Sequence, residues 1–143
     1  MITRRAALAM PLMTASLREA WATPQEANEL VMKFTGGKEP ARGRVSLAIP
    51  ELIEDGHFVP LTVSVESPMT AEDRVESILI AAGANPWPGI AVFHFSSLSG
   101  EAVVKTRVRL AATQMVQAIA KMSDGRFYVD RRTVEVTIGG CAG

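Results

Sequence analysis

The chain has 143 residues, of which 48% are hydrophobic and 21% charged, and its 15 basic residues balance its 15 acidic ones. This length is typical of a single domain, and the zero net charge with only 6% aromatic residues argues against a nucleic-acid or anionic-membrane surface. Two histidines and one cysteine are too few for a His/Cys metal cage and exclude an internal disulfide. No phosphate-binding or dinucleotide-binding glycine motif is present, so we expect neither a metal nor a cofactor.

Residues 1–22 have the layout of an export signal. Arg4 and Arg5 give a positive start, residues 6–15 are weakly apolar, and the Ala-Trp-Ala sequence at 20–22 is a small-x-small cleavage site. The adjacent arginines indicate the twin-arginine route, which exports folded proteins. We therefore expect a periplasmic protein whose mature chain starts at residue 23. The alternative is an amphipathic or frayed N-terminal helix.

A short helix is predicted to open the mature domain. Thr23 can cap this helix, Pro24 suits its first turn, and Glu26 completes a capping box. Apolar residues follow at helical spacing as far as Phe34, and the Gly-Gly pair at 36–37 ends the pattern.

After this helix the apolar residues alternate with a period of two, which is typical of strands. Turn-forming Gly, Pro, Asn and Asp residues separate the runs. The predicted strands cover 45–49, 59–65, 75–82, 90–95, 102–110, 127–129 and 133–138, while 115–122 fits either a strand or a helix. Many short strands at this spacing predict an all-β fold, namely an immunoglobulin-like antiparallel β-sandwich over residues 23–138, with a barrel as the alternative. No membrane span is expected in this domain.

The histidines and the acidic pairs have a simpler interpretation than catalysis. His57 falls in a predicted turn, and His94 falls between two phenylalanines in a predicted strand. The acidic pairs at 54–55 and 72–73 lie in turn-rich stretches. Solvation of turns and structural hydrogen bonding explain all of them, so no catalytic residue is predicted.

Two further features of the sequence are candidate interaction sites. Lys105, Arg107 and Arg109 share one strand face, which favours a solvent-exposed edge strand over a docking surface for an acidic partner. Trp87 lies between two prolines, and we expect it to pack into its turn rather than to anchor an interface.

The C-terminal segment 139–143 carries the only cysteine of the chain, in the sequence Gly139-Gly140-Cys141-Ala142-Gly143. Glycine leaves the backbone free, and an extended segment carries Cys141 about 10 Å from the end of the last strand. We expect a flexible arm that takes the thiol into a narrow cleft on another protein. Its deletion should then leave the fold and thermal stability nearly unchanged. The alternative is a frayed end with an incidental cysteine.

This C-terminal sequence resembles the Gly-Gly-Cys-Gly-Gly arm of the SoxY family, the sulfur carriers of periplasmic thiosulfate oxidation. The departure is Ala142, where the family pattern has glycine, which stiffens the arm and adds a methyl group beside the thiol. Other stretches that resemble the family are the twin-arginine start, Phe-Thr-Gly-Gly at 34–37, Val-Ser-Val-Glu-Ser-Pro-Met at 63–69 and Met-Ser-Asp-Gly at 122–125.

The resemblance implies that Cys141 is the covalent attachment site for thiosulfate-derived sulfur, first as a cysteine S-thiosulfonate, and that Gly139, Gly140, Ala142 and Gly143 form its arm. It also implies a heterodimer with a SoxZ-type subunit. A SoxXA-type cytochrome would load the carrier, a SoxB-type hydrolase would release sulfate, and other Sox enzymes would act on the remaining sulfur. The chain would then be a carrier without a cofactor, and not an enzyme.

Two other function classes stay open. One is a periplasmic thiol redox module, for which the sequence supplies no resolving cysteine. The other is a sheet-face binding protein in which Cys141 is incidental. No base or cation stands next to Cys141 in the arm, so we expect activation of the thiol to come from the cleft of a partner.

Overall fold

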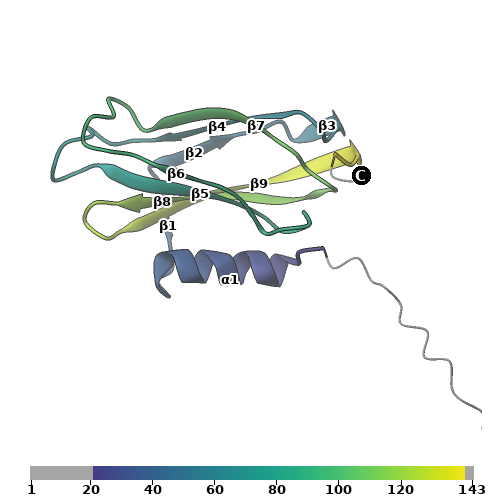
Figure 1. Cartoon of the computed structure of the whole chain (residues 1–143), viewed down its shortest axis with the longest axis horizontal. Coiled ribbons are helices and arrows are strands. Elements are labelled where there is room, and N and C mark those ends of the chain that lie inside the picture. The colour runs from purple at the N-terminus through teal and green to yellow at the C-terminus, as the bar shows by residue number, and fades with distance from the viewer. Residues whose placement is uncertain (1–20, 141–143) are drawn as a thin grey trace, which may run out of the picture.

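A computed structural model describes residues 21–140, so most of the predicted export signal at 1–22 and residues 141–143 of the predicted arm lie outside the described residues (Figure 1). The elements in chain order are α1 (Pro24–Thr35), β1 (Ala41–Arg42), β2 (Val45–Ala48), β3 (Leu52–Asp55), β4 (Val59–Val65), β5 (Val75–Ala82), β6 (Gly89–His94), β7 (Val103–Val108), β8 (Gln114–Met122) and β9 (Phe127–Ile138). Among residues 21–140 there is no helix with the length and apolar character that crossing a membrane requires.

The strands form two facing sheets, which confirms the predicted all-β sandwich (Figure 1). The larger sheet has the order β1-β9-β8-β5-β6, and β3 also pairs with β9; the smaller sheet has the order β2-β4-β7. The pairings are antiparallel except that the short strands β1 and β3 run parallel to β9. Strand β1 has only two residues, and β3 places two apolar residues before two acidic ones without alternation, so the sequence pattern predicts neither strand.

Strand β9 shows how the sheet overrides local polarity. The prediction gave two strands, 127–129 and 133–138, because the polar residues at 130–132 interrupt the apolar pattern. In the structure they belong to one strand, and their side chains find partners. Asp130 accepts a hydrogen bond from the backbone N–H of Leu47 at 2.8 Å, and Arg131 donates to Gln117 at 2.9 Å. The first of these bonds ties the two sheets together.

The hydrophobic core lies between the sheets, and a second apolar layer lies under the helix. Leu47 and Leu61 from the smaller sheet meet Ile78, Ile80 and Val116 from the larger one, all nearly inaccessible to solvent. The second layer consists of Val31, Leu79, Ala81, Ile119, Phe127 and Val129. Strands β5 and β8 are therefore covered on both faces, which gives them continuous apolar runs and explains why 115–122 fitted both a strand and a helix.

The helix has the ends predicted for it. The Thr23 hydroxyl accepts from the Glu26 backbone N–H at 3.2 Å, and the Glu26 carboxylate accepts from the Thr23 N–H at 2.7 Å. Gly36 ends the helix in the left-handed conformation, with φ of 64°. The helix packs on the outer face of the larger sheet, against β5 and β8, and lies on the side away from the smaller sheet (Figure 1).

Candidate functional site

The segment that leads to Cys141 is held against the body of the domain. Beyond the end of β9 the backbone N–H of Gly140 donates to the Leu110 carbonyl at 2.8 Å. Gly56 lies between these two segments, since its N–H donates to the Ile138 carbonyl at 2.8 Å and its own carbonyl accepts from Leu110 at 2.9 Å. We call this set of Gly56, Leu110, Ala111, Gly139 and Gly140 the arm root.

The arm root requires glycine because its backbone segments touch one another directly. A β-carbon at Gly56 would lie 2.9 Å from the Gly140 nitrogen and closer still to the Leu110 oxygen. One at Gly139 would lie 3.0 Å from the Ala111 carbonyl carbon, and one at Gly140 only 2.5 Å from the His57 nitrogen. Glycine at these positions therefore provides clearance, which is a different property from flexibility.

This geometry corrects the prediction of a flexible arm that starts at residue 139. Gly140 is buried and hydrogen-bonded, and Gly139 lies against Ala111, so both belong to the packed domain. Deletion of 139–143 would remove the bond from Gly140 to Leu110, so the expectation of nearly unchanged stability does not fit the structure. The error arose because glycine has the same sequence signature in a free tether and in a close backbone crossing.

A buried network of hydrogen bonds around Asn85 holds the 109–111 segment of the arm root in place. The Asn85 Oδ1 accepts from the Ala111 N–H at 2.9 Å and from the Gln114 Nε2 at 2.8 Å, while its Nδ2 donates to the Arg109 carbonyl at 2.9 Å. Asn85 and Gln114 are both 6% exposed. Asn85 thus fixes the segment on which Gly140 rests. In the sequence it looked like one more turn residue, and only the fold reveals this role.

The Asp55–His57 turn lies beside the arm root. Asp55 Oδ1 accepts from the His57 backbone N–H at 2.9 Å and lies 2.5 Å from Nδ1 of the His57 ring. The backbone N–H first, and the ring second, hold the pKa of Asp55 below its ordinary value. His57 occupies a turn as predicted, whereas Glu54 and Asp55 form the end of β3 rather than part of that turn.

This pair predicts an acid-sensitive contribution to stability. A carboxyl with a lower pKa in the native state than in the unfolded state contributes stability above about pH 3.9, and that contribution is lost as the pH falls through the native pKa. We expect wild type to unfold at a higher temperature than Asp55→Asn near neutrality, and the difference to close on acidification. Thermal unfolding of both proteins between about pH 2 and pH 7 measures this difference in unfolding temperature. A difference that does not change with pH would contradict this assignment.

The other candidate residues lie away from the arm root. His94 is exposed and lies at the end of the sandwich opposite to the arm root. It pairs with Ser77, Ser77 pairs with Lys121, and Lys121 pairs with Phe127. Phe127 is the first residue of β9, whereas the arm root follows the last one. Of the acidic pair at 72–73, Asp73 forms an ion pair with Arg44, with 2.7 Å between its carboxylate Oδ2 and the guanidinium nitrogen.

The basic residues at 105, 107 and 109 are exposed, and the first two lie on β7 at the edge of the smaller sheet, as predicted. Within residues 21–140, no group of three or more His, Cys, Asp or Glu side chains could hold a metal ion.

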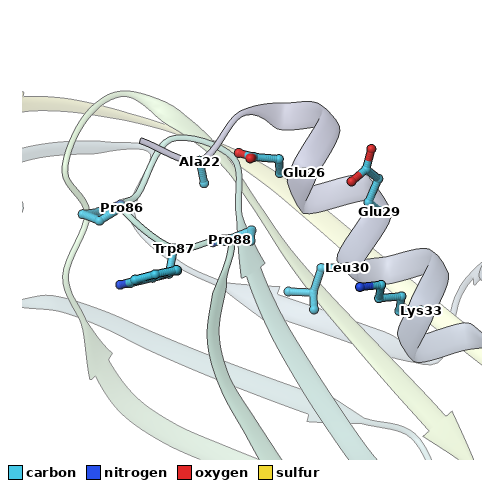
Figure 2. A pocket seen from close by; sticks show the side chains of 8 residues that line it. All are labelled: Ala22, Glu26, Glu29, Leu30, Lys33, Pro86, Trp87 and Pro88. Atoms are coloured by element: carbon cyan, nitrogen blue, oxygen red, sulfur yellow. The ribbon is translucent and has the colours of Figure 1, made fainter. Parts of the chain in front are cut away.

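The prediction that Trp87 packs into its turn is wrong. Its side chain is 78% exposed and borders a hollow of about 470 Å³ between α1 and the 86–88 loop, which Figure 2 shows with Leu30 and Glu29 on the helix side. Trp87 belongs to neither apolar layer.

The sequence model of a family described as "Sulfur oxidation protein SoxY" matches residues 31–141, a range that includes the arm root and Cys141. A search of curated proteins finds no significant match.

Solved structures with this fold include the sulfur carrier protein SoxY from Chlorobium limicola f thiosulfatophilum, at 26% identity and a TM-score of 0.63 over 80% of this chain and 98% of that one. A superoxide reductase (neelaredoxin) from Ignicoccus hospitalis aligns at 18% identity with a TM-score of 0.59, over 80% of this chain and 92% of that one. A putative superoxide reductase from Thermotoga maritima aligns at 16% identity with a TM-score of 0.58, over 72% of this chain and 89% of that one. The two reductases share the fold alone.

Proposed function

The chain belongs to the SoxY family and is a sulfur carrier of the Sox system, and we propose that it holds thiosulfate-derived sulfur covalently on Cys141. The observation that carries this proposal is the position of Cys141. It is the only thiol of the chain, it falls inside the matched region, and it follows directly on the docked Gly140.

The proposed loading step is an oxidation. The Cys141 thiolate and the terminal sulfur of thiosulfate form a sulfur–sulfur bond, which gives a cysteine S-thiosulfonate and releases two electrons. These electrons pass to a cytochrome of the SoxXA type, which this step needs as its oxidant. A hydrolase of the SoxB type then adds water to the sulfonate group, so that sulfate and two protons leave and a persulfide anion remains on Cys141. Other Sox enzymes oxidise that remaining sulfur.

The proposal includes a place and a partner. We place the mature chain in the periplasm, because Arg4 and Arg5 with the apolar run after them indicate twin-arginine export. The chain works there as a heterodimer with a SoxZ-type subunit. It acts as a carrier that enzymes modify, and this role requires no cofactor of its own.

Loading in vitro tests the proposal. The purified chain with its SoxZ-type subunit is incubated with thiosulfate, the SoxXA-type cytochrome and an electron acceptor, and its intact mass is recorded before and after a thiol reductant. We expect the mass of one thiosulfate group on the chain, lost on reduction. An unmodified mass while the same cytochrome loads another SoxY-family carrier would contradict the proposal.

A further inference from the structure

The outer face of the smaller sheet carries a row of exposed cations. Along β7, Lys105 and Arg107 are exposed, whereas the valines at 104 and 108 are buried. Both charged side chains therefore lie on the face of the sheet that points away from the core. Arg109 directly follows the strand and is exposed as well. We call Lys105, Arg107 and Arg109 the basic row.

The basic row has no counter-ion in the described part of the chain. None of the ion pairs within residues 21–140 includes any of its three members. Across the sheet, the partners of Lys105 and Arg107 on β4 are uncharged, namely Thr62 and Pro60, and the next strand, β2, contains no charged residue. The three cations therefore repel one another without a compensating attraction from these strands.

The face that bears the basic row is open. Helix α1 packs on the larger sheet, on the side away from the smaller one (Figure 1), and no other helix is present among residues 21–140. The outward side chains of β2 and β4 are short and uncharged, so the cations are the most prominent groups on this face. These outward residues are Ser46, Ala48, Pro60, Thr62 and Ser64.

Protection of a sheet edge against pairing with another chain is the other use of such charges. Strand β7 is an edge strand, but so are β2 in the same sheet and β6 in the larger one. Neither β2 nor β6 contains a lysine, arginine, aspartate or glutamate. The domain thus leaves two of its edges without such charges, and edge protection does not explain why three like charges follow one another on β7.

The basic row ends at the arm root. Arg109 immediately precedes Leu110, whose carbonyl accepts the hydrogen bond from Gly140. Phe58, which immediately precedes β4, is 69% exposed, and it lies at the same end because β4 begins where β7 finishes. A protein that lies along the basic row and covers Phe58 therefore reaches Gly140, the residue that precedes Cys141 in the sequence.

We propose that the basic row is the docking surface for an acidic patch on an enzyme that acts on the C-terminal cysteine, with Phe58 as the apolar anchor. Three aligned cations attract the carboxylates of such a patch and raise the association rate, and salt screens this attraction. A buried aromatic anchor slows dissociation. The inference rests on the proposed function, since it describes how the carrier meets its enzymes. It replaces the expectation that the basic residues only solvate an edge strand.

Association rates test the inference without any transfer of sulfur. The mature chain with its SoxZ-type subunit is passed over the immobilised SoxXA-type cytochrome and, separately, over the SoxB-type hydrolase, at about 20 mM and about 500 mM salt. The test variant combines Lys105→Gln, Arg107→Gln and Arg109→Gln. With at least one of the two enzymes, we expect it to associate about tenfold more slowly than wild type at low salt and at the wild-type rate at high salt.

The matched control removes three exposed cations from the other side of the molecule. It combines Lys33→Gln and Lys38→Gln, in and after α1, with Arg42→Gln on β1. The net charge changes by the same amount as in the test variant, so we expect association within about twofold of wild type at both salt concentrations. Phe58→Ala should instead speed dissociation at both salt concentrations and leave the association rate unchanged.

Cross-linking of the unaltered protein tests the same surface without a variant. A carbodiimide joins a lysine amine to a carboxylate in contact with it, as an amide, with loss of water. The chain has four lysines, at positions 33, 38, 105 and 121. We expect Lys105 to be joined to an aspartate or glutamate of the enzyme, and the other three lysines to stay unlinked to it.

Two outcomes would overturn the inference, and both differ from failure of the carrier function. One is equal association of the test and control variants with both enzymes at low salt. The other is a cross-link from Lys105 to the SoxZ-type subunit, since that subunit would then cover this face. Sulfur loading alongside either result would leave the carrier proposal intact. Association that depends on the basic row, in a chain that takes no sulfur, would support the docking surface and contradict the carrier proposal.

Discussion

Replacement of Cys141 by serine is expected to abolish thiosulfate-dependent reduction of the partner cytochrome. A serine hydroxyl does not ionise near neutral pH and cannot form the sulfur–sulfur bond of the adduct, so the rate should fall to that of the mixture without the carrier. The substitution exchanges a single side-chain atom at position 141, which follows directly on Gly140 in the sequence. The free energy of unfolding should therefore change by less than about 0.5 kcal/mol.

Ala142→Gly is the matched control for this substitution, because it alters the neighbouring residue and restores the glycine pattern that the SoxY family resemblance implies. It should load sulfur at least as fast as wild type. Cytochrome reduction by the serine variant at the wild-type rate would contradict the carrier proposal. Function would then be sought on a sheet face, with Cys141 incidental.

Replacement of Asn85 by alanine is expected to destabilise the domain by about 2–4 kcal/mol. The substitution leaves the buried Ala111 N–H without its acceptor and removes one of the two acceptors of the Gln114 amide. It also removes the donor to the Arg109 carbonyl. Urea denaturation of both proteins, with the slope compared as well as the midpoint, measures the loss.

Gln25→Ala serves as the control, since this residue of α1 is exposed to solvent. It should cost less than about 0.5 kcal/mol. A loss of the same size in both variants would show that Asn85 has no special role. Because Asn85 holds Ala111, its replacement should also speed amide hydrogen exchange at Gly140, which rests on the same segment.

Local sequence signals predicted the helix and the long strands well. The helix ends follow from Thr23, Glu26 and Gly36, whose contacts are made within a few residues. Strands β4 and β5 match their predicted bounds of 59–65 and 75–82, because their apolar runs are clear and their flanking turns contain Gly, Pro or Asp. Such features depend on near neighbours in the chain, which a sequence displays directly.

The candidate site could not be predicted in the same way, because its contacts join distant segments. Gly56 meets Leu110 and Gly140, and Asn85 meets Ala111 across 26 residues. None of these residues carries a signal of its own, so Gly56 and Asn85 both looked like turn residues. The Gly-Gly pair before Cys141 looked like a tether for the same reason. Its packing against Gly56 became visible only with the fold.

The measurement that tests the account most directly is peptide mass spectrometry of the protein isolated from its own cells during growth on thiosulfate. The carrier proposal predicts a sulfur or thiosulfonate adduct on the C-terminal peptide that contains Cys141, released by a thiol reductant. The same sample should begin at Thr23 if the export signal is removed as proposed. A free Cys141 thiol throughout active thiosulfate oxidation would contradict the central claim.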